Sequence, residues 1–307
     1  MMWLAARSSR GGTDANGGGV RRGPLAMIGA SFAFTCMVAF VKVAREELPA
    51  LDVVFWRAAI ATPLLLPAMR GANLRLAFKG AFTLRLLFGV SAMICFFTAA
   101  KGLPLVDLNL ITRLQPVLVA LIAPLVLGAG ERADRGVWIS TLAGFGGCAM
   151  ILAPSLAIGS LYGLIALGAT VFSTGAHLSL RKLAAHDGMR AIVLWFHVGL
   201  VILSGGALIA SGRGITPPPS STWPALVGVG VFATAGQLLL TRAYKADRAP
   251  IVAAASYSGI LWAVVLDVVF FESVPGADVL LGGLLVVASG VYLVVKGRTG
   301  RGTPGPT

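Results

Sequence analysis

The chain has 307 residues, of which 57% are hydrophobic and 12% charged, with a mean hydropathy of +0.86 and a formal net charge of +13. This balance excludes a soluble globular protein, which would expose too much apolar surface to stay dispersed. It also argues against a nucleic-acid partner, because the positive charge sits in short loops and tails, where membrane insertion places it.

Ten stretches of mostly apolar residues follow one another along almost the whole chain. Each is long enough to cross a hydrocarbon layer of ~30 Å as a helix. They predict an all-α membrane protein with spans at 24–41, 52–69, 82–100, 106–127, 136–153, 157–178, 190–211, 224–241, 250–271 and 278–296. Residues 1–23 are rich in Gly and Arg and lack an apolar pattern, so we expect a disordered tail, with a second tail at 297–307.

Lysine and arginine are distributed unequally between the two sides of these spans. With the N-terminus inside, nineteen lie on the inner side and four on the outer side, while Arg57 and Arg113 lie within spans. Loops rich in positive charge stay in the cytoplasm. The sequence therefore predicts a multi-pass protein of the cell (inner or plasma) membrane with both termini cytoplasmic.

The second half of the chain echoes the first. Residues 99–131 read AAKGLPLVDLNLITRLQPVLVALIAPLVLGAGE, and residues 242–272 read RAYKADRAPIVAAASYSGILWAVVLDVVFFE. The alignment places Ala100 on Ala243, Gln115 on Ser258 and Ala120 on Ala263, and the openings Gly29–Ala33 and Gly168–Phe172 also match in kind. Because each copy holds an odd number of helices, the two copies at 24–153 and 157–296 form inverted five-helix repeats. Such repeats are characteristic of secondary transporters, whose site lies at the repeat interface.

The two repeated passages, GLPLVDLNLITRLQPVLVALIAPLVLG with Glu131 and TRAYKADRAPIVAAASYSGILWAVVLDVVFFE, resemble the signature regions of EamA-type transporters. These belong to the drug/metabolite transporter superfamily, and the resemblance covers roughly residues 24–296. It implies that helices 5 and 10 are peripheral and that the other eight line a central cavity. It also implies a secondary transporter of small polar metabolites, exporting amino acids or related carboxylates. Uptake or exchange of S-adenosylmethionine or another metabolite is the alternative within the same fold.

Polar side chains within the spans are the candidate site, because a charge in hydrocarbon costs several kcal/mol. Arg113 lies in the fourth span, with Asn109 and Gln115 close to it along the helix. Pro116 removes a backbone donor and frees a carbonyl near Thr112. In the paired span, Ser256 and Tyr257 occupy the matching level, so we expect the two clusters to face each other between the repeats. The competing interpretation is hydrogen bonding that only packs the helices.

Four further residues complete the candidate set. Arg57 either reaches out to the outer interface or lines the site, and Trp195 and Trp262 either form cavity walls or anchor the helices at the interface. Asp267 either pairs with an arginine or couples transport to protons. Two arginines against one aspartate leave a net positive charge in the outer half, which favours a substrate with a carboxylate or phosphate.

Other classes of function find little support in the sequence. The chain has no GxxxxGK[ST] phosphate loop and no HExxH motif, and no histidine is evidently placed to activate a serine. A membrane-embedded enzyme and a channel remain the alternatives from other classes. We expect no cofactor and no metal, with Cys36, Cys95 and Cys148 as packing residues. A small metabolite and membrane lipid are the expected partners, and the glycine faces of the fifth and tenth spans serve either repeat contact or a homodimer.

The predicted orientation can be tested by labelling single cysteines in a Cys-less background. Arg213→Cys should react with a membrane-impermeant reagent from outside, and Asp187→Cys only from inside. The reverse pattern would mean that the charge distribution has been assigned to the wrong sides.

Overall fold

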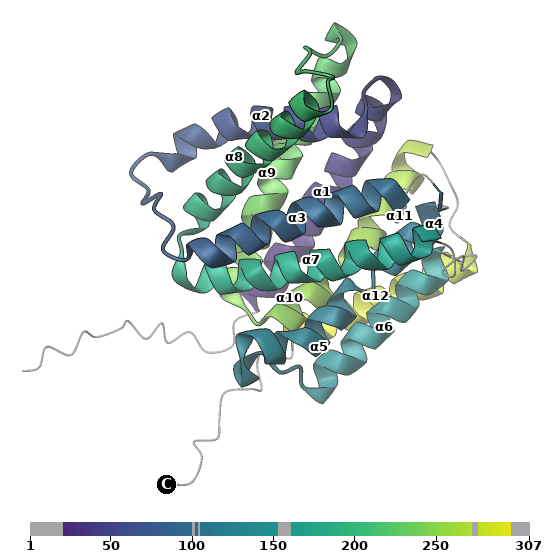
Figure 1. Cartoon of the computed structure of the whole chain (residues 1–307). Helices are drawn as coiled ribbons and strands as arrows, with labels where there is room; N and C mark the ends of the chain where they lie inside the picture. The colour runs from purple at the N-terminus through teal and green to yellow at the C-terminus, as the bar shows by residue number, and fades with distance from the viewer. Residues whose placement is uncertain (1–20, 100–101, 104, 153–160, 272–275, 296–307) are drawn as a thin grey trace, which may run out of the picture.

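The computed structural model describes residues 21–99, 102–103, 105–152, 161–271 and 276–295 (Figure 1). Within these ranges the chain consists of helices and their connections, and ten helical segments are long and apolar enough to cross a membrane. The predicted all-α, ten-span fold is therefore confirmed. The predicted tail at 297–307 and residues 1–20 of the predicted tail at 1–23 lie outside the described residues.

In chain order the elements are α1 Arg22–Glu47, α2 Ala50–Leu65, η1 Leu66–Met69, α3 Lys79–Ala99, α4 Leu105–Thr112, α5 Gln115–Leu127, η2 Ala129–Glu131, α6 Arg135–Leu152, α7 Leu161–His186, α8 Met189–Ala210, η3 Ser220–Thr222, α9 Trp223–Ala246, α10 Ala249–Ala255, α11 Ser258–Phe271 and α12 Ala277–Val295. Thus α4 with α5, and α10 with α11, each form one span. The end of the bundle where α1 begins is named the inner end and the opposite one the outer end, following the predicted orientation.

Several helices run further than their predicted spans. The spans at 24–41, 157–178 and 224–241 become helices that continue to Glu47, His186 and Ala246. Hydropathy detects only the part of a helix that lies in hydrocarbon, whereas the backbone pattern continues into the interface, where charged side chains reach water. The predicted boundaries were therefore too short at these ends.

The helices pair as two inverted repeats should. The first helix of each repeat packs along the third helix of the other, α1 with α9 and α7 with α3. The second helices, α2 and α8, contact each other, and so do the fifth helices, α6 and α12. Figure 1 shows α6 and α12 at the opposite edge of the bundle from α2 and α8. The repeats are interleaved, and the fifth helices are peripheral as the resemblance implied.

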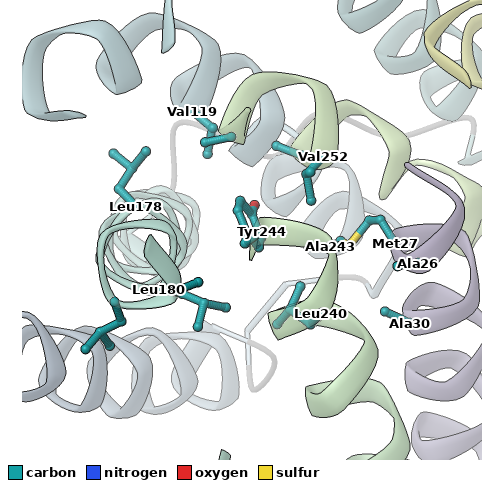
Figure 2. Close-up of a cluster of buried hydrophobic side chains, with 14 of the residues drawn as sticks. Ala26, Met27, Ala30, Val119, Leu178, Leu180, Leu240, Ala243, Tyr244 and Val252 are labelled. Atoms are coloured by element: carbon teal, nitrogen blue, oxygen red, sulfur yellow. The ribbon is translucent and has the colours of Figure 1, made fainter. Parts of the chain in front are cut away.

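A buried cluster holds both repeats together at the inner end. Helices α1, α5, α7, α9 and α10 all contribute apolar side chains to it. Figure 2 shows Tyr244 of α9 at its centre, between Leu178 of α7 and Met27 of α1. Tyr244 is fully buried, so the side chains of this cluster cover its ring completely.

Ion pairs and carboxylate caps reinforce the inner end. Glu131 in η2 accepts a bond from Arg181 Nε at 2.7 Å and another from the backbone N–H of Ala249 at 2.6 Å. One carboxylate of the first repeat is thereby tied to two helices of the second, α7 and α10. Arg21 and Asp247 add a pair at 3.3 Å between the start of α1 and the connection after α9. The inner end is closed by contacts between the repeats.

The connection between α7 and α8 alters the choice of labelling positions. Asp187 is 4% exposed, and its carboxylate accepts bonds from the backbone N–H groups of Ala77 and Phe78 at 2.6 and 3.3 Å. A cysteine there would release the loop before α3. The exposed neighbour His186 is therefore a safer inner position for the labelling test than Asp187. At the outer end, the exposed Ser220 can be labelled in place of Arg213.

Helices α6 and α12 cross where two glycines meet. A Cβ built on Gly147 would lie 2.6 Å from the carbonyl oxygen of Gly282, and a Cβ on Gly282 would lie 2.6 Å from that of Gly147. Neither backbone can yield without separating the helices. The small-residue faces predicted from the sequence thus serve contact between the repeats at this crossing.

Replacing glycines by alanine in α6 tests whether a glycine is needed for the close crossing with α12, because alanine otherwise favours the helix. Gly147→Ala should lower the unfolding temperature in detergent, at a cost of about 1–3 kcal/mol for overpacking. Gly146→Ala is the matched control, because a Cβ there meets nothing within 4 Å, and it should be neutral or slightly stabilising. Equal effects of both substitutions would contradict the close crossing.

Candidate substrate-binding site

The middle helices of both repeats break at equivalent positions. Helix α4 ends at Thr112 and α5 begins at Gln115, while α10 ends at Ala255 and α11 begins at Ser258. Gln115 and Ser258 are the two positions that the sequence alignment superimposes. Pro116 accounts for the first break, because it removes the donor for the carbonyl one turn earlier. The second break has no proline, and the sequence did not predict it.

At each break a backbone carbonyl that already accepts an N–H of its own turn, that of Gly259 or of Leu114, also accepts a bond from a hydroxyl of the other repeat. Ser31 Oγ in α1 donates to the carbonyl of Ser256 at 3.5 Å, and Thr170 Oγ in α7 donates to that of Ile111 at 3.2 Å. Ser31 and Thr170 occupy matching places in the two repeat openings. These two bonds are second bonds to carbonyls that are already paired, and they link the broken helices of each repeat to the first helix of its partner.

Arg113 lies inside the first break and reaches the second. Its Nη1 atom donates to the carbonyl of Ser256 at 3.3 Å, and a Cβ on Gly259 would lie 3.4 Å from the same nitrogen. Tyr257 is within electrostatic range of the guanidinium. The structure therefore brings together Arg113 and Ser256, the central members of the two predicted clusters, and keeps Tyr257 close to them.

The two amides predicted beside Arg113 have different surroundings. Asn109 is partly buried, and its carbonyl accepts the backbone N–H of Arg113 at 3.1 Å. Gln115 is buried, and its Nε2 contacts Nδ1 of His177 on α7. The ring of His177 stacks on Tyr244 with centroids 5.4 Å apart. Gln115 thus connects the first break to the closed inner end.

The aromatic residues of α11 and its start lie along a groove rather than across from Arg113. The Tyr257 ring is 1% exposed and packs against Gly144 of α6. Trp262 donates from Nε1 to the carbonyl of Ile28 at 3.3 Å. Both line a largely apolar groove of about 440 Å³ between α1, α11 and α12.

Three other predicted residues lie apart from the breaks. Trp195 is 41% exposed near the inner end of α8, donates from Nε1 to the carbonyl of Leu74 at 2.8 Å, and is not brought near Arg113. Arg57 in α2 contacts the sulfur of Met37 at 3.5 Å, and its Nε atom is buried without a partner. Asp267 lies in α11, but its side chain is outside the described residues.

Sequence reasoning missed a third arginine inside the bundle, and of the three it is the buried one, whereas Arg57 and Arg113 are partly buried. Arg85 was assigned to the inner loops, but α3 begins at Lys79, so Arg85 lies ~9 Å along the helix. It is 5% exposed, donates to Gln237 Oε1 at 3.4 Å, and lies with its Cζ 4.4 Å from the centroid of the Phe196 ring. The four ion pairs among the described residues include none of Arg57, Arg85 or Arg113.

Comparison with known proteins places this arrangement in a family. Residues 21–153 match the EamA-like transporter family. A pseudopaline exporter, CntI, of Pseudomonas aeruginosa (strain UCBPP-PA14) is 34% identical over 286 residues, which cover 92% of this chain and 98% of the exporter. The chain belongs to the EamA-like transporter family. The recognition made from the two repeated passages is therefore confirmed.

More distant relatives extend the comparison. A riboflavin transporter of Vibrio cholerae is 25% identical, with 89% of this chain and 92% of the transporter covered. A protein of known crystal structure superimposes with a TM-score of 0.76 at 19% identity, covering 90% of this chain and 99% of its own. The fold is thus shared with that protein along nearly the whole length.

The bond between Thr170 and the first break can be tested by an isosteric change. Thr170→Val should destabilise the protein by about 1 kcal/mol, the usual contribution of a hydrogen bond between membrane helices. The Thr170 hydroxyl also bonds the carbonyl of Ala166 in its own helix at 3.0 Å. Thr174→Val is the control for the loss of such an intrahelical bond, because that buried hydroxyl donates within its own helix, to the carbonyl of Thr170 at 2.9 Å. Thermal unfolding in detergent measures the stability lost in each variant. Equal losses of stability would contradict a bond between the repeats.

Proposed function

We propose that this chain is a secondary transporter that exports small metabolites bearing carboxylates, amino acids or related compounds, by alternating access between its two repeats. The membrane is the cell membrane, with both termini in the cytoplasm. Membership of the EamA-like family supports transport, and the name of the Pseudomonas relative supports export. The chain has no phosphate loop for ATP hydrolysis, so a gradient or exchange supplies the energy.

The observation that carries the substrate class is the charge of Arg113. The guanidinium has several N–H donors, and within the described residues its acceptor is the carbonyl of Ser256, while the ion pairs found there do not include it. A charge inside the bundle without a counter-ion is costly in a membrane. A carboxylate can accept two parallel bonds from one guanidinium and neutralise it. A bound carboxylate would thereby supply the counter-ion of Arg113.

The position of Arg113 also supports alternating access. It connects the break of the first repeat to the break of the second, so an anion bound there contacts both halves at once. Movement of one repeat against the other would carry the anion between the two sides. Opening toward the cytoplasm requires the bonds of Glu131 to Arg181 and Ala249 to separate, because they join the repeats at the inner end.

Transport by pure protein in sealed vesicles tests this function. Labelled amino acids and dicarboxylates should exchange across the membrane without nucleotide. Arg113→Gln should lower kcat/KM by at least about tenfold, because a hydrogen bond to a charged group contributes about 1.5–3 kcal/mol.

Arg45→Gln serves as the matched control, because Arg45 is exposed at the outer end, and it should transport like the wild type. A strict requirement for ATP would overturn the secondary mechanism. Unchanged kinetics of Arg113→Gln would overturn the role of the arginine.

A further inference from the structure

We infer that the substrate carries at least two carboxylates, one bound at Arg113 and a second at a separate cationic site formed by Arg57, Arg85 and His197. This inference rests on the proposed transport function and narrows its substrate class. A monocarboxylate or a simple zwitterion would leave one of the two cationic sites without an anion.

The second site is assembled from three neighbouring helices. Arg57 comes from α2, Arg85 from α3 and His197 from α8, and apolar residues of the same three helices pack together in one buried cluster. Arg85 Cζ lies 4.4 Å from the ring centroid of Phe196, and that ring lies 6.0 Å from the ring of His197. The charges of Arg57 and Arg85 act on each other and on His197, so the three side chains lie in one part of the bundle although they are far apart in the sequence.

Polar atoms at this site lack the partners that buried groups normally have. The Nε atom of Arg57 and the Nε2 atom of His197 are both buried and have no hydrogen-bond partner within the part of the chain that the structure describes, and His197 is 0% exposed. Its Nδ1 lies 2.8 Å from the carbonyl of Val193, so Nδ1 carries the proton and Nε2 is an acceptor in the neutral ring. Most buried polar atoms are satisfied in folded proteins, so unsatisfied atoms beside two arginines indicate a ligand.

The charge balance defines that ligand as an anion. Arg57 has a thioether sulfur as its neighbour and Arg85 has an amide oxygen and an aromatic ring, so neither positive charge is neutralised by these contacts. Two like charges within range of each other raise the cost of burial further. A carboxylate between the two guanidinium groups would relieve both. An N–H or O–H group on the same substrate would complete the site by donating to Nε2 of His197.

Arg113 belongs to a different part of the bundle. Its neighbours are Ser256, Gly259 and Tyr257 at the helix breaks, whereas the neighbours of Arg85 are Gln237 and Phe196. One carboxylate cannot serve both surroundings. A substrate with carboxylates at two of its ends satisfies both, and a third acidic group is compatible with the three positive charges.

Binding of matched acids to purified protein tests the inference. Calorimetry would compare the dicarboxylates from succinate to adipate with the monocarboxylate of the same chain length, with inorganic phosphate at equal ionic strength as a general anion. In the wild type, the best dicarboxylate should bind at least about tenfold more tightly than its monocarboxylate and than phosphate. Arg57→Gln, Arg85→Gln and Arg113→Gln should each reduce that ratio to about one, while Arg45→Gln keeps it.

Lysine variants protect the test against misfolding. Arg57→Lys and Arg85→Lys retain the charge, so they should keep part of the ratio, and the unfolding temperature without ligand reports whether each variant is folded. If the glutamine variants fail to fold, the inference is judged on the ratio of dicarboxylate to monocarboxylate affinity in the wild type and in the lysine variants.

A wild-type ratio of about one, or no binding by any dicarboxylate, overturns the inference, and so does equal binding of phosphate. Nucleotide-independent transport that depends on Arg113 would still stand in that case, so failure of this inference is distinct from failure of the proposed function.

Discussion

The contact between the helix breaks and the opposite repeat is the interaction on which the interior of this structure depends. A membrane offers no water to a broken helix, so its carbonyls are paired within the protein. The carbonyls of Ser256 and Ile111 each accept a backbone N–H of their own turn, and a hydroxyl of the other repeat, from Ser31 or Thr170, adds a second bond. Both added bonds cross from one repeat to the other, in agreement with the interleaved pairing of α1 with α9 and of α7 with α3.

The breaks in turn give the interior its polar character. A continuous helix would hide its carbonyls, whereas the turn at Ser256 presents one to the guanidinium of Arg113. A second pair of arginines, Arg57 and Arg85, lies in α2 and α3 with neutral neighbours. We therefore propose that carboxylates of the substrate neutralise these arginines when it binds. At the inner end, the bonds of Glu131 to Arg181 and to the backbone of Ala249 join the two repeats.

Much of this could be predicted because it depends on local composition. The spans follow from apolar length, the inverted repeats from an odd number of helices in two similar halves, and the first break from Pro116. The family followed from the two repeated passages and is confirmed by comparison. Orientation and the bounds of the repeats remain predictions from charge and alignment.

Tertiary structure decided what depends on neighbours in space. No local signal distinguishes Arg85 from an interfacial arginine, because only the start of α3 and the contact with Gln237 place it inside the bundle. The second break has no proline, and its contact with Ser31, which lies far away in the sequence, exists only in the folded chain. The indole groups of Trp195 and Trp262 bond to carbonyls of other segments, Leu74 and Ile28, and only the fold shows these partners. The sequence by itself determined the spans, since hydrophobic length is a property of each segment, whereas only packing decided which polar side chains meet.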